Sequence, residues 1–478
     1  MPSGIRASEV KATRTLPLAA ALVVATLLAG CSQSAEPSSS QSSPEQSASS
    51  ASPSSSGGTD SPIYLTSSEI QQHDLSGLAL TWRGGMVGGT ALKGGTATVV
   101  GWIPGMSEVA VCELEPWQDG ETQPTDTVVD SAIDVMATTG DKPVVMLLYP
   151  AMAEASGLDA QTTHVYAQSV DLSSCSLGER VDVAGEVPKD LTATAPKFIG
   201  TSENVLAVAP FSSLTTSLPD VPAIIGIDAG KGSTAWKQSF PGKQIEVRND
   251  YLEGAQNNES VFDLGVQDNS QPAATQVRTL VSAATGETVA TAGDFEAPSV
   301  SLGEDVFLYT DASGEGVHDP QTVVENGKAK QVSGGVMAPT AVAGDDGEGN
   351  RVLVGFYCAA DASDCDLTGS GHALGYVGAD ASIHEILPAS KVESLGLKLL
   401  GFSNGNIYVE TTSEHLIVGL DGKQVGDAYD EDKFPFHPVA ETSTSDGLWT
   451  LWATDTGISG GSADYAITKD GEQPENPL

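Results

Sequence analysis

Short strand-like runs separated by tight-turn dipeptides fill most of this chain and constrain its fold more than any other feature. From about residue 62 to residue 478, apolar runs alternate with Gly, Asn and Asp turns. Asp-Gly or Asn-Gly pairs begin at residues 119, 326, 346, 404, 421, 446 and 470. Both central residues of a type I′ turn need positive φ, so such pairs are the strongest short-range signal of a β-hairpin. The sequence therefore predicts an all-β fold.

The strand-like runs group into units of about four. Residues 397–428 are the clearest example, with the runs Lys398–Phe402, Ile407–Thr411, His415–Leu420 and Lys423–Val425. Similar units cover residues 198–240, 300–332, 340–387 and 438–478, and looser versions cover residues 132–183 and 244–292. Residues 80–131 hold an eighth candidate. The best helix candidate, around Lys391–Leu400, is short.

A repeat of about 35–55 residues with four strands is typical of a β-propeller, in which each sheet is one blade. One such sheet cannot bury both of its faces alone, so the blades stack around an axis. We therefore expect a β-propeller of seven or eight four-stranded blades and favour eight. Tandem β-sandwiches are the competing interpretation. A sandwich needs about 100 residues per domain, and no linker divides residues 80–478 in that way.

One turn carries a more specific pattern. Residues 225–236 read Ile-Gly-Ile-Asp-Ala-Gly-Lys-Gly-Ser-Thr-Ala-Trp. This stretch resembles the repeat of quinoprotein-like (PQQ-like) β-propellers, in which an apolar strand is followed by Asp-Ala-x-Thr-Gly-x-x-x-Trp. Asp228, Gly232 and Trp236 match the pattern, and Lys231 replaces the Thr. The resemblance implies that Gly232 makes the last hairpin of a blade and that Trp236 packs between blades.

A second, weaker copy of the pattern ends at Gly286, where Ser282 replaces the Asp and Ala290 replaces the Trp. Quinone enzymes of this superfamily carry the Trp motif in most blades, and some hold adjacent cysteines near the cofactor. This chain carries the motif Trp once and has no adjacent cysteines. The resemblance therefore reaches the propeller superfamily without implying a quinone, and we expect no cofactor.

The first 30 residues have the layout of a secretory signal. Basic residues precede an apolar run from Leu16 to Leu28, which is shorter than the roughly 20 residues that span a bilayer. The run ends in Leu28-Ala-Gly-Cys31, which resembles the lipobox of bacterial lipoproteins. The resemblance implies a diacylglyceryl thioether on Cys31, acyl chains such as palmitate, and cleavage just before Cys31. An ordinary signal peptide with a chance cysteine is the alternative.

The segment after Cys31 predicts a flexible tether. Fifteen of residues 32–61 are Ser, interspersed with Pro and Gly. Such a composition buries little apolar surface and favours disorder, with an end-to-end distance of roughly 30 Å. The expected organisation is a lipoprotein signal peptide at 1–30, the lipidated Cys31 with a disordered linker to residue 61, and a β-propeller domain at 62–478. This places the domain on the extracytoplasmic face of the cell membrane.

Four cysteines follow Cys31, at positions 112, 175, 358 and 365. An even number in an exported protein predicts two disulfides, for which three connectivities exist. We favour Cys358–Cys365, because its short interval closes one hairpin loop, and Cys112–Cys175, which ties the first two units together. No C-x₂-C spacing occurs, so zinc ligation by these cysteines is not expected.

The charge balance narrows the range of partners. The chain has 22 Lys+Arg against 63 Asp+Glu, for a net charge of −41. Binding to a phosphate backbone depends on Lys and Arg, and so does polybasic attachment to a membrane. We therefore expect no nucleic-acid partner, and a membrane contact through the lipid alone.

Enzyme motifs occur only as near misses. Residues 89–96 have glycines at phosphate-loop spacing but lack the Lys that follows the second glycine of a phosphate loop. Ser403 and Ser459 each lie in a G-x-S-x-G string but lead into further strand-like sequence, whereas a nucleophile elbow leads into a helix. The seven histidines show no metal-ligand spacing, and a Ser-His-Asp constellation is spatial, so it stays open. Acidic clusters at 345–348, 361–366 and 427–432 lack EF-hand spacing and are interpreted as solvated turns.

Three functional hypotheses follow. The first is a lipid-anchored, non-enzymatic propeller that binds a protein or an envelope polymer, because recognition residues favour loops on a rigid scaffold. The second is an extracytoplasmic enzyme, either a quinone-dependent dehydrogenase or a hydrolase, with its site at the propeller axis. The third is a solute-binding lipoprotein of a transporter, which requires two α/β lobes rich in helix.

Overall fold

The computed structural model describes most of the chain between residues 61 and 474. The described residues are 61–72, 81–82, 87–93, 95–122, 133–139, 142–153, 162–183, 185, 196–210, 213–214, 224–240, 243–247, 260–268, 276–292, 295–303, 306–311, 321–325, 328–338, 341–362, 365, 371–378, 380–428, 436–444, 447–454 and 464–474. The predicted signal sequence, Cys31 and all but the last residue of the predicted linker lie outside them.

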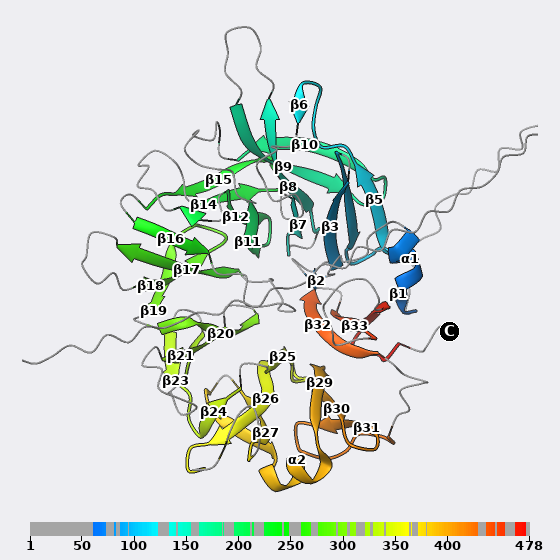
Figure 1. Cartoon of the computed structure of the whole chain (residues 1–478), viewed down its shortest axis with the longest axis vertical. Helices are drawn as coiled ribbons and strands as arrows, with labels where there is room; N and C mark the ends of the chain where they lie inside the picture. Colours follow the sequence, from blue (N-terminus) through cyan, green and yellow to red (C-terminus); the bar gives the residue numbers. More distant parts are fainter. Residues whose placement is uncertain are drawn as a thin grey trace, which may run out of the picture. The chain divides into compact units, whose positions relative to one another are not determined.

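Within these residues the chain forms eight antiparallel sheets, numbered here in chain order (Figure 1). The predicted all-β class is confirmed. The first sheet contains β2 (Thr81–Trp82), β3 (Val87–Lys93), β4 (Thr96–Trp102) and β5 (Ala110–Leu114). The second contains β6 (Glu121–Thr122), β7 (Asp134–Ala137), β8 (Val145–Ala153), β9 (Thr162–Asp171) and β10 (Ser176–Asp182).

The next three sheets correspond to the predicted units at 198–240, 244–292 and 300–332, except that β13, from within the first of these units, belongs to the fourth sheet. The third sheet contains β11 (Lys197–Ser202), β12 (Val205–Ala209), β14 (Ile224–Asp228) and β15 (Ser233–Gln238). The fourth contains β13 (Ser213–Leu214), β16 (Lys243–Val247), β17 (Val261–Asp268), β18 (Gln276–Ser282) and β19 (Thr288–Ala292). The fifth contains β20 (Phe295–Gly303), β21 (Val306–Asp311), β22 (Gln321–Glu325) and β23 (Lys328–Gln331).

The last three sheets complete the described chain. The sixth contains β24 (Gly335–Met337), β25 (Val342–Asp345), β26 (Arg351–Ala359), β27 (Ala373–Val377) and β28 (Ile383–Leu387). The seventh contains β29 (Lys398–Ser403), β30 (Asn406–Glu410) and β31 (His415–Gly419). The eighth contains β32 (His437–Thr444), β33 (Gly447–Ala453), β34 (Tyr465–Lys469) and β1 (Ile63–Leu65).

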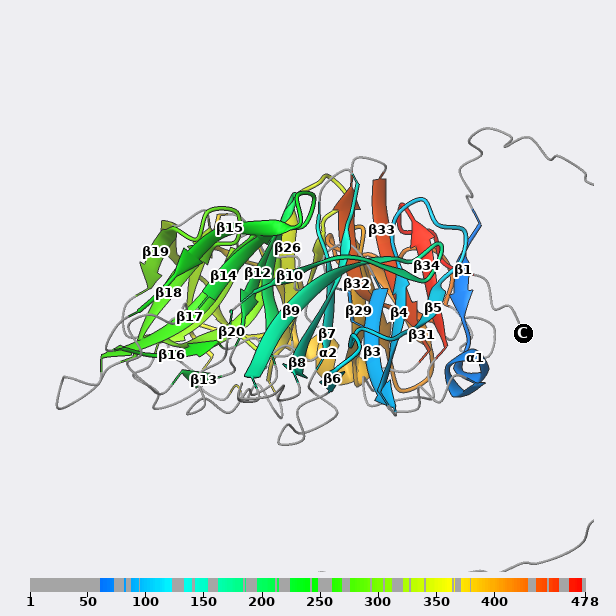
Figure 2. The ribbon, with the colours of Figure 1, turned by 90° about the horizontal axis from the view of Figure 1, so that it is seen from above.

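Five of these sheets differ from the predicted four-strand units. The second, fourth and sixth sheets contain five strands each. In the seventh sheet the expected fourth strand, Lys423–Val425, forms only an isolated bridge between Val418 and Gln424. In the eighth sheet the fourth strand comes from the start of the described chain, because β1 pairs with β34 and places Ile63 opposite Ile467. Figure 2 shows blue β1 beside red β34. A periodicity search within one unit cannot find a strand that lies at the far end of the sequence.

The described chain contains two short helices, α1 (Ser67–Gln72) and α2 (Ala389–Leu395). Helix α2 occupies part of the predicted segment but begins earlier and ends at Leu395. Its C-cap, Gly396, has a left-handed φ of 58°, and Lys398 then starts β29. Neither described helix has the length and apolar character needed to cross a bilayer. The helix-rich α/β lobes of the solute-binding hypothesis are therefore wrong for this chain.

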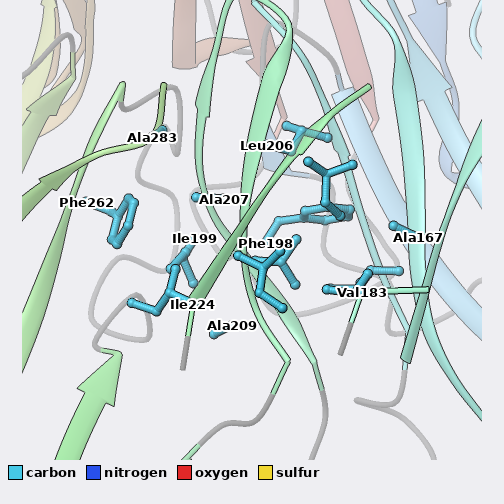
Figure 3. Close-up of a cluster of buried hydrophobic side chains, with 14 of the residues drawn as sticks. Ala167, Val183, Phe198, Ile199, Leu206, Ala207, Ala209, Ile224, Phe262 and Ala283 are labelled. Carbon is cyan, nitrogen blue, oxygen red and sulfur yellow. The ribbon is translucent and has the colours of Figure 1, made fainter. Parts of the chain in front are cut away.

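The central strands are apolar on both faces because each face packs on a different sheet. In β8, Met146 and Leu148 join a cluster with the third and fourth sheets, whereas Leu147 and Tyr149 join a cluster with the first sheet. All four side chains are buried. Figure 3 shows the first cluster, with Ile224 of the third sheet lying between side chains of its two neighbours. Each large side chain buried in this way stabilises the fold by about 1.5–3 kcal/mol.

Each sheet contacts the next along the chain, in all but one case through a shared apolar cluster. Separate clusters pack the first sheet on the second, the second on the third and fourth, the fifth on the sixth, the sixth on the seventh, and the seventh on the eighth. The fourth sheet meets the fifth where β18 contacts β20. The eighth sheet also packs on the first, with the rings of Trp449 and Trp102 centred 4.8 Å apart.

Candidate functional site

The predicted repeat motif lies at the outer hairpin of the third sheet, between β14 and β15. Asp228 ends β14, and its Oδ1 accepts a hydrogen bond from the backbone N–H of Lys231 at 3.0 Å. The Lys231 side chain bonds the same carboxylate and holds the pKa of Asp228 below its usual value. Gly232 has a φ of 60°, a left-handed conformation that favours glycine.

Trp236 packs between the third and fourth sheets. A β-carbon on Gly226, its cross-strand partner, would lie 2.2 Å from the indole. A β-carbon on Gly286, in the outer hairpin of the fourth sheet, would lie 2.5 Å from the other side of the ring system. The indole Nε1 donates a hydrogen bond to the carbonyl of Ala283 in that same hairpin, at 3.0 Å. One side chain therefore fixes the third sheet to the fourth.

A further copy of the motif, which the sequence pattern did not reveal, runs from Asp171 to Glu179 in the second sheet. Asp171 Oδ1 accepts the backbone N–H of Ser173, as Asp228 accepts that of Lys231. Cys175 stands at the glycine position and has a φ of 48°. The Glu179 carboxylate takes the place of the tryptophan, and its Oε2 lies 3.7 Å from where a β-carbon on Gly232 would be.

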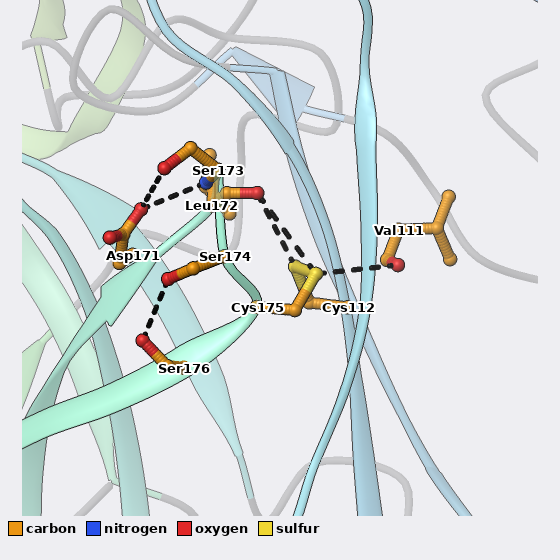
Figure 4. The surroundings of a disulfide bond; sticks show 8 residues. All are labelled: Val111, Cys112, Asp171, Leu172, Ser173, Ser174, Cys175 and Ser176. Atoms are coloured by element: carbon orange, nitrogen blue, oxygen red, sulfur yellow. Dashed lines mark hydrogen bonds between the residues drawn. A yellow bond between two sulfur atoms is a disulfide. The ribbon is translucent and has the colours of Figure 1, made fainter. Parts of the chain in front are cut away.

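The structure joins the two cysteine pairs that the sequence predicts. Cys112 of β5 bonds Cys175 in the outer hairpin turn of the second sheet (Figure 4), with Cα atoms 5.0 Å apart. Cys358 of β26 bonds Cys365 seven residues later. The Cys112–Cys175 bond links the outer strand of one sheet to the outer turn of the next. Trp236 connects the third sheet to the fourth in the same way without a covalent bond.

The near-miss enzyme motifs lie in hairpins wherever the structure describes them. Residues 89–93 belong to β3, and Thr96 begins β4. Ser403 ends β29, and a two-residue turn at Asn404-Gly405, with φ values of 47° and 74°, leads straight into β30. No helix follows Ser403, so the nucleophile-elbow geometry is absent there. Ser459 lies outside the described residues.

The aspartates of the acidic cluster at 345–348 accept hydrogen bonds from the backbone of their own loop. Asp345 Oδ1 accepts backbone N–H groups from Gly347 and Gly349, and Asp346 Oδ1 accepts those of Glu348 and Asn350. Within the described part of the chain, no group of three or more His, Cys, Asp or Glu side chains is arranged to hold a metal ion. Most of the acidic residues in the clusters at 361–366 and 427–432 lie outside the described residues.

A buried glutamate forms the most unusual polar centre of the described chain. Glu441 of β32 is 0% exposed. Its Oε2 accepts the backbone N–H of Asp345 in the sixth sheet at 2.8 Å, and its Oε1 accepts the backbone N–H of Asn404 in the seventh sheet at 3.0 Å. The carboxylate therefore bonds the hairpin turns of two neighbouring sheets from a third.

A single cation faces this glutamate in the described structure. Arg351 Nη1 lies 3.5 Å from Glu441 Oε2, and the Arg351 side chain is 8% exposed. That nitrogen makes no hydrogen bond to any described group. Burial raises the pKa of Glu441. The hydrogen bonds from Ser403 and from the backbone, and the positive charge of Arg351, act in the opposite direction. Carboxyls with a shifted pKa cluster at functional sites, although structural networks produce them too.

A second polar cluster lies on the face of the second sheet that is turned toward the first. Arg180 of β10 forms two hydrogen bonds of 2.8 Å to the Glu121 carboxylate. Its guanidinium also lies 3.9 Å from the ring centre of Tyr166, a cation–π contact. His164 stacks on Tyr166 and bonds Asp182 at 2.9 Å. The hydrogen bonds from Arg180 hold the pKa of Glu121 below its usual value.

Buried Tyr149 links this cluster to the core. Its hydroxyl donates to Gln168 Oε1 at 2.8 Å, and burial raises its pKa to about 12. The cluster fixes the segment that crosses from the first sheet to the second, because Glu121 begins β6 and pairs with Ala153 of β8. Neither cluster was predicted. Their members lie far apart in the sequence and occur in no motif, so only the strand register brings them together.

Comparison with known proteins leaves the family open. No protein-family model matches this chain, and no curated protein matches it. Among solved structures, an acylaminoacyl peptidase from Pyrococcus horikoshii is similar with 11% identity and a TM-score of 0.31, covering 72% of this chain and 52% of the peptidase. A prolyl endopeptidase is similar with 10% identity and a TM-score of 0.32, covering 81% of this chain and 55% of that protein.

A eukaryotic initiation factor is also similar, with 8% identity and a TM-score of 0.32, covering 77% of this chain and 96% of that protein. The chain spans about half the length of each of the two peptidases. Likenesses at this level carry no argument about function.

Proposed function

We propose that this chain is a lipid-anchored, extracytoplasmic β-propeller of eight blades that binds a protein or an envelope polymer. In this proposal each sheet is one blade, Cys31 carries the lipid, and the Ser-rich segment to residue 61 is the tether. The partner reaches the domain through loops presented by a rigid scaffold.

One observation carries the proposal for the fold. The described chain forms eight successive antiparallel sheets, each packed on the next, and the eighth also packs on the first through Trp449 and Trp102. The pairing of β1 with β34 supports the same arrangement, since it joins the two ends of the described chain in one sheet. Small-angle scattering and an experimental structure of residues 62–478 test the blade count.

The proposal for the anchor rests on the sequence from Leu28 to Cys31. Two acyl chains are needed for stable membrane attachment, which a diacylglyceryl group supplies. Labelling cells with a palmitate analogue and fractionating the membranes tests this directly. We expect label and membrane recovery for the natural chain and for Cys358→Ser, and loss of both for Cys31→Ser. Label that persists in Cys31→Ser contradicts the anchor.

Binding is favoured over catalysis by where the polar groups lie. Glu441 and Tyr149, two titratable groups whose pKa is raised by burial, are each 0% exposed and bonded within the protein. A general acid or base must come within hydrogen-bond reach of its substrate. Neither buried group meets that condition in this structure.

Cross-linking in intact cells tests the binding role. The anchored chain is cross-linked, enriched under denaturing conditions and compared with the Cys31→Ser chain, which is released from the membrane in the proposal. Recovery of one partner, enriched reproducibly with the anchored form, supports the proposal. A deep data set with no enriched protein or polymer counts against it.

A further inference from the structure

We propose that Asn404–Gly405, in the turn between β29 and β30, is a deamidation site that the fold keeps unreactive by bonding its two reacting groups to different sheets. This inference is independent of the lipid anchor and of any binding partner. The sequence has two Asn-Gly pairs, at 326 and 404, and the structure describes the second. Glycine has no β-carbon, so the backbone nitrogen that follows an asparagine is least hindered in such a pair.

Deamidation is a reaction of the asparagine side chain with the next backbone nitrogen. The Gly405 nitrogen loses its proton to base and attacks Asn404 Cγ. The new N–Cγ bond closes a succinimide ring, while the Cγ–Nδ2 bond breaks and Nδ2 leaves as ammonia. Water then opens the ring at either carbonyl and gives an aspartyl or an isoaspartyl residue. Water and base suffice as co-reactants, but the nitrogen and Cγ must meet in a defined orientation.

The attacking nitrogen is bonded to the sixth sheet. The N–H of Gly405 donates to the carbonyl of Asp345, the last residue of β25, at 2.8 Å. A β-carbon on Gly405 would lie 2.6 Å from the carbonyl oxygen of Asp346, so the turn packs directly on the backbone of that loop. The proton that base must remove is therefore already donated, and the nitrogen is held against the β25–β26 loop.

The carboxamide of Asn404 is bonded to the eighth sheet instead. Its Nδ2 donates to the carbonyl of Asp470, in the turn that follows β34, at 3.0 Å. Gly471 packs on the same side chain, because a β-carbon there would lie 2.8 Å from Asn404 Cβ and 2.9 Å from Nδ2. The backbone N–H of Asn404 also bonds the eighth sheet, through Glu441 Oε1 at 3.0 Å. Two different neighbours of the seventh sheet therefore hold the nucleophile and the leaving group.

Reaction at this pair requires both hydrogen bonds to be broken. Such bonds open in the fraction of molecules that unfold locally or globally, so the rate in the folded chain is the rate in the unfolded chain multiplied by that fraction. The products do not fit the closed turn. An aspartyl side chain has no N–H for the Asp470 carbonyl, and an isoaspartyl residue adds a methylene to a two-residue turn that is bonded on both sides. Deamidation at Asn404 therefore marks chains that have opened.

Incubation of the whole protein in mildly alkaline buffer, with and without denaturing urea, tests the protection. Acid digests are analysed by mass spectrometry for the replacement of ammonia by water at Asn404. We expect the folded chain to react at least about tenfold more slowly than the denatured chain, the protection expected from two hydrogen bonds. Equal rates in the two states overturn the proposal.

Gly471→Ala tests whether the contact with the eighth sheet protects the carboxamide. The added methyl group meets Asn404 Cβ and Nδ2 and displaces the side chain from Asp470. Gly426→Ala is the matched control, because both glycines have a φ of 72° but Gly426 has open space around it. With both variants folded, Asn404 should react about fivefold or more faster in Gly471→Ala, the effect expected for one hydrogen bond, and at the natural rate in Gly426→Ala. Equal rates in the two variants contradict this protection.

Asn404→Asp reproduces one product and keeps the proposal testable if Gly471→Ala fails to fold. Its carboxylate cannot donate to the Asp470 carbonyl, so the unfolding constant in urea should rise by about fivefold or more. Asn204→Asp is the matched control, because Asn204 is an exposed asparagine in the β11–β12 turn and its replacement adds the same charge. Equal unfolding constants for the two variants would show that the product fits the closed turn and overturn its role as a mark of opening.

Discussion

The indole of Trp236 lies directly against Gly286, so that a β-carbon on Gly286 would come within 2.5 Å of the ring. The two residues belong to neighbouring sheets, and the Nε1–H of the same indole bonds Ala283 three residues before the glycine. Because this contact is close-packed, a side chain added at Gly286 has no room unless the indole or its surroundings move. The contact explains why a glycine stands in that turn.

Gly286→Ala should therefore destabilise the protein strongly. The substitution places a methyl group against the indole and also strains a residue whose φ is 71°. Overpacking of this kind costs about 1–3 kcal/mol beyond the backbone cost. Gly95→Ala is the matched control, because Gly95 also has a left-handed φ, of 89°, but open space around it. Equal losses in urea unfolding for the two variants would show that the Trp236 contact contributes nothing.

Removal of the two disulfides should have unequal effects. Cys112–Cys175 closes an interval of 63 residues and Cys358–Cys365 an interval of seven. In the chain-entropy model these closures stabilise by about 4 and about 2 kcal/mol. Cys112→Ser should accordingly lower the melting temperature more than Cys358→Ser. Scanning calorimetry of both variants decides the order, and peptide mapping of the unreduced protein verifies the pairing in each.

Once Cys112 is replaced, the protein should be more stable with glycine at position 175 than with another residue. The φ of 48° at Cys175 suits glycine, and the corresponding positions in the next two sheets are Gly232 and Gly286. In the Cys112→Ser background, Cys175→Gly should be more stable than Cys175→Ala by about 1 kcal/mol, because a left-handed residue with a β-carbon is strained. Urea unfolding measures the difference. The reverse order would show that the turn relaxes when the disulfide is absent.

Glu121 should stabilise the fold less as the pH falls. Its pKa is lowered in the folded chain, whereas that of Glu441 is raised. The hydrogen bonds from Arg180 lower the pKa of Glu121 below the ordinary 4.5, so the folded chain keeps it ionised to lower pH than the unfolded chain does. Its contribution is present above about pH 4.5 and is lost as the pH falls through the folded value. Glu121→Gln should cost about 1–2 kcal/mol at pH 7, and less in acid. A cost in urea unfolding that is constant from pH 7 to pH 3.5 contradicts this.

Local turn chemistry made the hairpins and the Trp236 motif predictable from sequence. Asp228 and Gly232 stand at fixed offsets in a turn, and such short-range rules survive in any surroundings. The second-sheet copy was missed because Cys175 holds the glycine position, and a disulfide takes over the cross-sheet connection there. The pattern needs a left-handed residue and a link to the next sheet, and more than one residue type supplies each.

The features that the sequence did not predict depend on pairing between segments that are far apart in the chain. The eighth sheet takes its fourth strand from Ile63–Leu65, which no local unit contains. Glu441 was not singled out because nothing in its neighbourhood marks it. Its partners Asp345 and Asn404 come from two other sheets and donate backbone groups, which leave no trace in the sequence. Sites built from main-chain donors become visible only when the register of several sheets is known.

The pairing of Ile63 with Ile467 also makes the eighth sheet depend on segments from both ends of the described chain. Synthesis proceeds from the N-terminus, so β1 is made about 400 residues before the strand it pairs with. Until Tyr465–Lys469 exists, Ile63 and Leu65, both buried in the mature fold, have no sheet to join. A chain that lacks β34 therefore leaves these two apolar side chains exposed, and proteases and chaperones can recognise such exposed apolar segments. The pairing of β1 with β34 is therefore among the last contacts of the described fold to form.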